Sequence, residues 1–149
     1  MNILSNIFNL NKIDCPRCLG KGHVDLNDIK RLNKELKWGP GECAYCNGKG
    51  KINPKIQNKI PVDMTYLTTD LSKQERKKLI NNDKQALIKG LVSEKKADDL
   101  IKQVEFLHFE GKLNPDKIVE LFLIPQNEIS STEKQELLDY IVRIIEHKK

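Results

Sequence analysis

All four cysteines of this chain lie in two copies of one pattern, C-x-x-C-x-G-x-G, which reads CPRCLGKG from Cys15 and CAYCNGKG from Cys43. Two residues between the cysteines of a pair let the chain turn so that both sulfurs reach one ion. Zinc takes four ligands in a tetrahedron, and two such pairs supply four thiolates. We therefore predict one bound zinc ion with the ligands Cys15, Cys18, Cys43 and Cys46.

Glycine occupies the same two places after each cysteine pair. The chain must turn there in backbone conformations that a Cβ atom resists, and glycine permits them. Each half is therefore predicted to be a tight knuckle that leads into a short strand or hairpin, with an approximate twofold axis at the metal. The turn glycines are Gly20, Gly22, Gly48 and Gly50.

Four thiolates fill the coordination sphere, which indicates a structural zinc site and not a catalytic one. His23 is a further candidate ligand, or a hydrogen-bond partner of a ligand. Other states of the cysteines stay open: buried thiols without metal, two disulfides, or thiol-disulfide exchange at one pair. The N-terminal sequence lacks the features of a secretion signal, so we expect a cytoplasmic protein, where reducing conditions favour zinc over disulfides.

Composition divides the chain into four segments. Residues 1–12 are predicted to be an N-terminal arm, and residues 13–53 the zinc module. Residues 54–69 contain two prolines and no sustained periodicity, which predicts a linker. Residues 70–149 carry repeated helix signals and form the predicted helical domain. The expected fold is thus a small zinc-knuckle and β-hairpin module with an inserted helix, followed by an all-α domain.

The inserted helix is predicted from the apolar residues that recur every three or four positions between Leu26 and Leu36. Asp25 can cap its N-terminus, and the helix must end before Trp38 and the Gly-Pro-Gly that follows. This predicts about twelve helical residues.

Four to five helices are expected in residues 70–149, because N-cap residues and a proline precede periodic apolar runs. Breaks are expected near Gly90, at Gly111 and at Pro125. The run IVELFLI is apolar around most of its circumference and is predicted to be central to the bundle or to cover a partner surface. The predicted starts are Ser72, Asp83, Ser93, Asn114, and either Ser130 or Ser131.

The two motifs resemble those of the cysteine-rich zinc domain of DnaJ-type co-chaperones, over residues 13–52. That domain has four such motifs and two zinc sites, whereas this chain has two motifs and an inserted helix. The chain also lacks the His-Pro-Asp tripeptide of a J-domain. The resemblance implies a β-hairpin-like module that binds polypeptide through one zinc-stabilised fold.

Positive charge is concentrated in the first part of the chain. Residues 1–60 hold 11 lysines and arginines against 5 acidic residues, while the whole chain has a net charge of +5. A basic zinc module favours an acidic partner, which can be nucleic acid, an acidic protein surface or a membrane face. Alternatively the lysines are solvated and Trp38 covers the core. The candidate contact residues are Arg17, Lys21, Lys30, Arg31, Lys34, Lys37, Trp38, Tyr45 and Lys49.

The sequence contains no enzyme motif: no phosphate-binding glycine loop, no nucleophile elbow and no paired histidines. No apolar run is long enough to span a membrane. We therefore predict a non-enzymatic adaptor or chaperone-like protein that binds another protein. The alternative is a regulator that binds nucleic acid through the basic zinc module.

Overall fold

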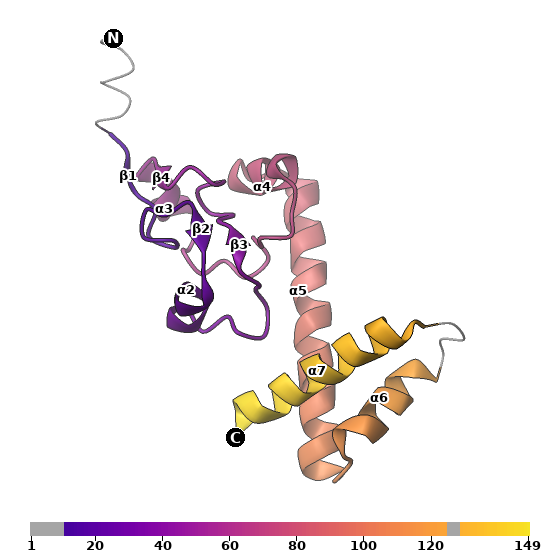
Figure 1. Cartoon of the computed structure of the whole chain (residues 1–149). Coiled ribbons are helices and arrows are strands. Elements are labelled where there is room, and N and C mark those ends of the chain that lie inside the picture. Colours follow the sequence, from indigo (N-terminus) through magenta and orange to yellow (C-terminus); the bar gives the residue numbers. More distant parts are fainter. Residues whose placement is uncertain (1–10, 125–128) are drawn as a thin grey trace. The chain divides into compact units, whose positions relative to one another are not determined.

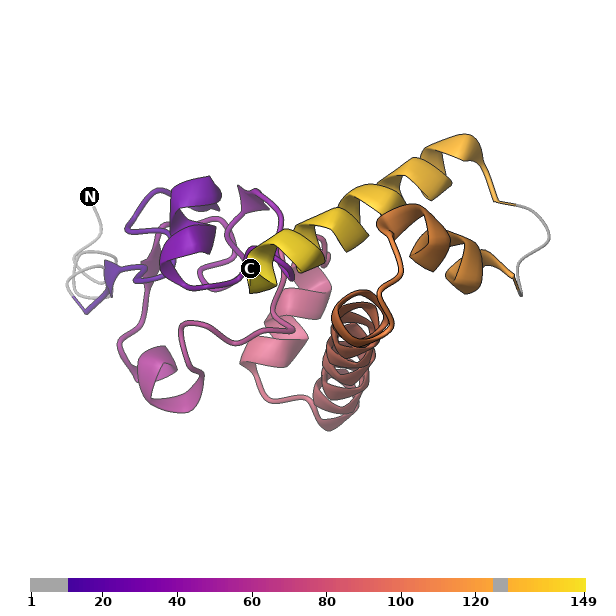
Figure 2. The ribbon, with the colours of Figure 1, turned by 90° about the horizontal axis from the view of Figure 1, so that it is seen from below.

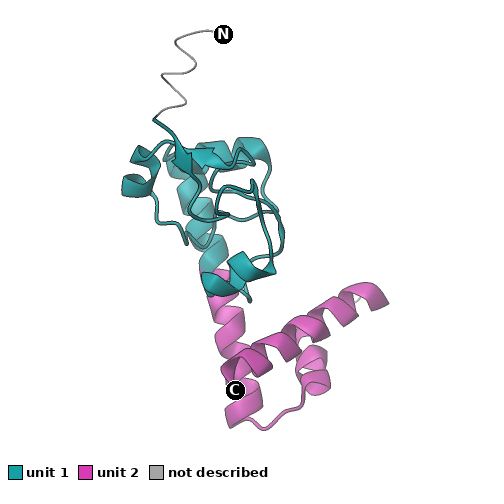
Figure 3. Cartoon of the chain, turned by 60° about the vertical axis from the view of Figure 1, so that its left-hand side comes forward, with its two compact units in different colours: residues 1–94 teal, residues 95–149 magenta. Residues whose placement is uncertain are grey.

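The computed structural model describes residues 11–124 and 129–149. It divides into two compact units, of which the first ends at Glu94 and the second covers Lys95–Lys149 (Figure 3). Most of the predicted N-terminal arm, residues 1–10, lies outside the described residues. The elements follow in the order β1 (Ile13–Asp14), β2 (His23–Val24), α2 (Leu26–Arg31), β3 (Gly41–Glu42), β4 (Lys51–Ile52), α3 (Lys55–Lys59), α4 (Lys73–Ile80), α5 (Lys84–Glu105), the π-helix η1 (Phe106–Glu110), α6 (Pro115–Leu123) and α7 (Ser131–Lys148) (Figure 1).

In the first unit, each C-x-x-C-x-G-x-G motif forms a turn, residues 15–22 and 43–50, which we call the two knuckles. Two short antiparallel sheets join them. β1 pairs with β4, which places Ile13 opposite Ile52. β2 pairs with β3, which places His23 opposite Glu42. The strand that enters each knuckle therefore pairs with the strand that leaves the other one. A small β module followed by helices was expected from the sequence, and the structure confirms the fold class at that level.

The inserted helix α2 has six residues, so the prediction of about twelve was wrong. Its start is as expected, because Asp25 and Asp28 form a reciprocal capping box. Its end is set by Asn33, which adopts a left-handed conformation with φ of 58°. The amide of Lys34 then donates to the carbonyl of Ile29 at 2.9 Å, which closes the helix. The apolar residues recur at helical spacing as far as Leu36, so the sequence pattern did not indicate that the helix ends before Asn33.

The predicted linker, residues 54–69, packs against the cysteine module. It contains the short helix α3, and its Ile60 and Leu67 are buried in the same hydrophobic core as the four cysteines. Leu79 of α4 completes that core. This segment is therefore part of the first unit, and the core extends well beyond the two knuckles.

Helix α5 is one continuous helix of 22 residues, where the sequence predicted two. Gly90 does not end a helix. A Cβ atom at this position would lie 2.6 Å from the ring of Tyr66, which is too close for any real contact. The glycine therefore allows the first half of α5 to approach Tyr66, and Ser93 lies within the helix.

We expect Gly90→Ala to destabilise the first unit by about 1–2 kcal/mol, because the added methyl collides with the Tyr66 ring. In an open helix the same change would stabilise by about 1 kcal/mol. Denaturant unfolding followed by the fluorescence of Trp38, the single tryptophan, measures the effect. Ser93→Ala, on an exposed part of α5, is the control. A gain in stability for Gly90→Ala would contradict the packing described.

The second unit is built around α6 and α7, which pack against each other (Figures 1 and 2). Asn114 caps α6 and Pro115 occupies its first turn, as predicted. Leu121 and Ile124 are exposed, so α6 buries one face and is not central around its whole circumference. Pro125, the predicted end, lies outside the described residues. The buried residues of this unit are Val104, Ile118, Val119, Ile141, Ile144 and Ile145.

Within residues 11–124 and 129–149, no helix has the length and apolar character needed to cross a membrane.

Candidate metal centre

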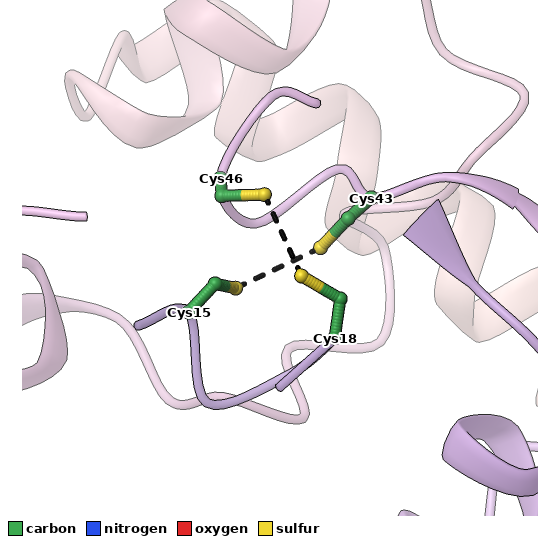
Figure 4. Close-up of side chains that lie close together, drawn as sticks. All are labelled: Cys15, Cys18, Cys43 and Cys46. Carbon is green, nitrogen blue, oxygen red and sulfur yellow. Dashed lines mark hydrogen bonds between the residues drawn. The ribbon is translucent and has the colours of Figure 1, made fainter. Parts of the chain in front are cut away.

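The four cysteines meet in one buried cluster, although 28 residues separate the two motifs. Each pair comes from one knuckle, and the four sulfurs point toward a common centre (Figure 4). Cys15 Sγ lies 3.8 Å from Cys43 Sγ, and Cys18 Sγ lies 3.8 Å from Cys46 Sγ. All four sulfurs lie within 4.8 Å of one another.

These distances fit a tetrahedral metal site. A metal with sulfur ligands at about 2.3 Å keeps its sulfurs about 3.8 Å apart. A disulfide needs an S–S distance of about 2.05 Å, and all four cysteines are free thiols. His23 belongs to strand β2, is exposed and is not a member of the cluster. In the part of the chain that the structure describes, this is the one cluster of possible metal ligands found. The cluster can hold one zinc-like ion.

Backbone hydrogen bonds repeat around the cluster with twofold symmetry. The amide of Gly22 donates to Cys18 Sγ at 3.2 Å, and the amide of Gly50 donates to Cys46 Sγ at 3.1 Å. The amide of Cys15 donates to the carbonyl of Gly50, and that of Cys43 to the carbonyl of Gly22. Each knuckle therefore supports the other, and amide donors stabilise negative charge on two sulfurs.

The second glycine of each motif is needed because the two knuckles approach closely. A Cβ atom on Gly22 would lie 2.8 Å from the carbonyl oxygen of Gly48. A Cβ atom on Gly50 would lie 2.6 Å from the carbonyl oxygen of Gly20. All four turn glycines have φ between 78° and 85°, a region that favours glycine. The repeated glycines are therefore explained by the contact between the halves as well as by the turns.

The close sulfurs change one another's acidity. The hydrogen bond with Cys43 raises the pKa of the Cys15 thiol, and burial adds to that effect. Hydrogen bonds from Cys15 and Cys43 lower the pKa of the Cys46 thiol. Because metals bind thiolates, metal binding here releases protons and its affinity falls as the pH falls.

In each C-x-x-C motif, the residue just before the second cysteine is buried. Arg17 is 1% exposed and Tyr45 is fully buried. The Arg17 guanidinium lies 4.1 Å from the ring centroid of Trp38. Burial lowers the pKa of Arg17 to about 10, while Cys43 and Cys15 oppose that shift. Arg17 is therefore a cation at neutral pH, placed beside Cys15 and Cys43.

These buried side chains bind the backbone of residues 60–67, the middle of the predicted linker. Five of its carbonyl groups accept hydrogen bonds from side chains of the module, which supply donors that a sheet or helix would otherwise provide. The bonds are Tyr45 Oη to the carbonyl of Ile60 (2.7 Å), Arg17 Nε to Val62 (2.8 Å), Arg17 Nη2 to Met64 (3.2 Å), Trp38 Nε1 to Thr65 (2.9 Å) and Arg17 Nη1 to Leu67 (2.6 Å). Lys34 Nζ adds a bond to Thr65 Oγ1 at 2.9 Å.

The predicted contact residues divide into internal and surface groups. Arg17, Trp38 and Tyr45 are buried, so in this structure they offer no surface to a partner, and the burial of Trp38 agrees with the alternative in which it covers the core. Among the others, Lys30 and Lys49 are exposed. Four more are occupied by neighbours: Lys21 pairs with Asp25 and Asp28, Arg31 donates to the Arg17 carbonyl and Asp28, Lys34 bonds Thr65, and Lys37 is half-buried with a partner of its own.

Arg76 of α4 is a residue that sequence reasoning missed. It is 3% exposed and donates to Glu42 Oε2 at 3.0 Å and to Asn47 Oδ1 at 3.2 Å. The hydrogen bond from Arg76 lowers the pKa of Glu42. A further bond runs to the carbonyl of Thr69 at 2.8 Å. Arg76 thus fixes α4 to the second knuckle, and no local pattern in KQERKKLI distinguishes it from its exposed neighbours.

At one matching position of the two knuckles, the first has a leucine and the second an asparagine. Leu19 and Asn47 occupy matching places with φ of 56° and 54°. Leucine is strained there and 61% exposed, whereas asparagine tolerates the conformation. We expect Leu19→Asn to stabilise the first unit by about 0.5–1 kcal/mol, measured by denaturant unfolding. The reverse exchange, Asn47→Leu, is the matched control and should destabilise it, since Arg76 also loses an acceptor.

No family model, no curated protein and no solved structure matches this chain. The residues of the cluster and of its surroundings therefore carry the functional argument.

Proposed function

We propose that this protein is a non-enzymatic adaptor in which one zinc ion, bound by the four cysteines, holds a scaffold that binds another protein. The observation that carries the proposal is the closed cluster of four buried sulfurs spaced for a tetrahedral ion. Four thiolates leave no coordination position for water or substrate, so the ion organises the chain and performs no chemistry. The resemblance of the motifs to a polypeptide-binding domain agrees with this role.

The surroundings of the cluster support a structural ion. Arg17, Tyr45 and Trp38 use their polar atoms to hold residues 60–67, and those residues complete the hydrophobic core. A metal that positions both knuckles therefore positions the segment that follows them. The ion would organise the first unit to the end of α4 and beyond, which is more than the predicted zinc module of residues 13–53.

Nucleic-acid binding is the weaker candidate. Recognition of single-stranded nucleic acid uses exposed aromatic rings that stack on bases. Trp38 and Tyr45, the aromatic residues of the knuckle region, are 7% and 0% exposed. The lysines that remain on the surface can attract phosphate but offer no such platform.

Metal analysis of the purified full-length chain tests the proposal. We expect one zinc per chain and about four reactive thiols only after denaturation in a chelator. A zinc content far below one per chain, with the thiols reduced, would remove the basis of the proposal. Binding to generic RNA or DNA that weakens steeply with salt would instead favour the nucleic-acid alternative.

A further inference from the structure

The first half of α5 carries an apolar surface that the fold does not use. Eight large hydrophobic side chains are exposed in the described residues, and three of them lie within five positions of this helix. Ile88, Leu91 and Val92 are 62%, 55% and 49% exposed. Their spacing of three and four residues places them side by side on one face. We call these three residues the α5 stripe.

Packing of α5 in the first unit does not explain the stripe. The helix already has a buried side, where Ala86 and Leu87 pack against the hydrophobic core and Gly90 approaches Tyr66. Helix propensity does not explain it either, because isoleucine and valine are weaker helix formers than the lysine and glutamine nearby. An exposed group of this kind marks a surface that contacts another molecule.

Charge around the stripe defines the partner. Three exposed lysines border the stripe. Lys84 lies one turn before Ile88, Lys89 directly follows Ile88, and Lys96 lies one turn after Val92. Within the described residues no ion pair is found for any of the three, whereas Lys95 pairs with Asp99 at 3.2 Å. Residues 84–96 contain four lysines and one glutamate. The stripe is therefore an apolar surface with a positive border.

We propose that the α5 stripe is the docking site for an amphipathic helix with an acidic border, supplied by a partner protein; this inference rests on the proposed adaptor function and names the partner class. Apolar side chains of such a helix cover Ile88, Leu91 and Val92, and its carboxylates meet Lys84, Lys89 and Lys96. A second copy of this chain would bring two positive borders together, which opposes self-association through this face.

The test uses the full-length zinc-loaded protein with labelled isoleucine, leucine and valine methyl groups. The probe is a synthetic 18-residue helical peptide with leucines along one face and glutamates beside them. We expect its addition to shift the methyl signals of Ile88, Leu91 and Val92, with a dissociation constant that rises as salt is added. A peptide with the same leucines and lysines in place of the glutamates should bind at least tenfold more weakly.

Matched variants separate the two contributions. Leu91→Glu and Lys89→Glu should each weaken binding of the acidic peptide at least tenfold. Lys78→Glu on α4 makes the same charge change at an exposed position outside the stripe, and as the control it should change binding by less than twofold. Equal effects of test and control variants would overturn the inference.

Other occupants give different results, each of which would overturn the inference. Self-association would make the stripe signals depend on protein concentration without peptide. If the chain's own residues 1–10 docked there, deleting those residues would change the methyl signals of the stripe. Stripe signals that respond to RNA and not to the acidic peptide would indicate nucleic acid. Zinc content is measured on the same samples, so loss of the proposed zinc site is distinguished from failure of the stripe.

Discussion

If the four cysteines hold zinc as proposed, Cys43→Ser will yield a chain that no longer retains zinc and whose first unit is unfolded. Serine is a poor zinc ligand, and three thiolates leave the tetrahedron open. Zinc held by four cysteines contributes on the order of 10 kcal/mol or more at neutral pH, which exceeds the stability of a typical small domain. The loss of one ligand is therefore expected to remove the ordered state and not only to weaken it.

The extent of unfolding is the informative result. If the ion only tied the two knuckles together, order would be lost in residues 13–53. The structure places Ile60, Leu67 and Leu79 in one core with the cysteines, so we expect the loss to extend through α4. Amide spectra of the full-length variant would show this residue by residue. The signals of the second unit, Lys95–Lys149, should keep their folded positions because its core is built from its own helices.

Two controls make the test specific. Adding a chelator to the unchanged protein should reproduce the spectrum of Cys43→Ser, because both remove the ion. Ser72→Ala removes the N-cap hydroxyl of α4 but no sulfur ligand, and should leave the zinc content at one per chain. A folded Cys43→Ser protein with ordered residues 60–67 would contradict the central role of the cluster.

The cluster of four cysteines was predictable because the pattern that produces it is local in the sequence. Ligand spacing and the two glycines of each motif are determined by geometry within eight residues, and the structure brings the four cysteines together as those patterns indicate. The start of α2 was predictable for the same reason, since its capping box spans Asp25 to Asp28. Helix lengths were less predictable. Asn33 ends α2 by adopting a left-handed backbone conformation, and Gly90 lies within α5 because it packs against the ring of Tyr66, which is distant in sequence.

The role of residues 54–69 could not be read from the sequence. Its contacts use backbone carbonyl groups, which every residue carries, and the donors lie 15–50 residues away in the chain. A polar, proline-containing segment without periodicity is typical of a linker. The side chains that donate to this segment were predicted as surface contacts, because arginine, tryptophan and tyrosine in a basic region are also typical of a binding surface. Only the fold shows that Arg17, Trp38 and Tyr45 face inward.

Arg17 therefore lies where the cysteine cluster, the knuckles and residues 60–67 meet. Zinc with four thiolates carries two negative charges, and a buried negative group needs a nearby cation or donors. Arg17 provides positive charge beside Cys15 and Cys43 and gives three hydrogen bonds to carbonyl groups. Its planar guanidinium also stacks on Trp38, which a lysine cannot reproduce.

We expect Arg17→Met to lower the free energy of unfolding of the first unit by about 3–5 kcal/mol, since the carbonyl groups of Val62 and Leu67 lose their side-chain donor and that of Met64 keeps only the Leu67 amide. Zinc affinity should fall by about 10- to 100-fold, as is usual when a group that supports the ligands is removed. Unfolding is measured by denaturant at fixed free zinc, and affinity by competition with a chelator of known strength.

Two further variants assign the effect to its cause. Arg17→Lys keeps the charge but loses the three-carbonyl geometry, so it should recover most of the zinc affinity and little of the stability. Arg31→Met removes an arginine of the same module that is largely at the surface and makes one bond to the Arg17 carbonyl, and should cost about 1 kcal/mol. Equal losses for Arg17→Met and Arg31→Met would show that the buried position of Arg17 does not matter. Full recovery of stability by lysine would show that charge alone holds residues 60–67 against the knuckles.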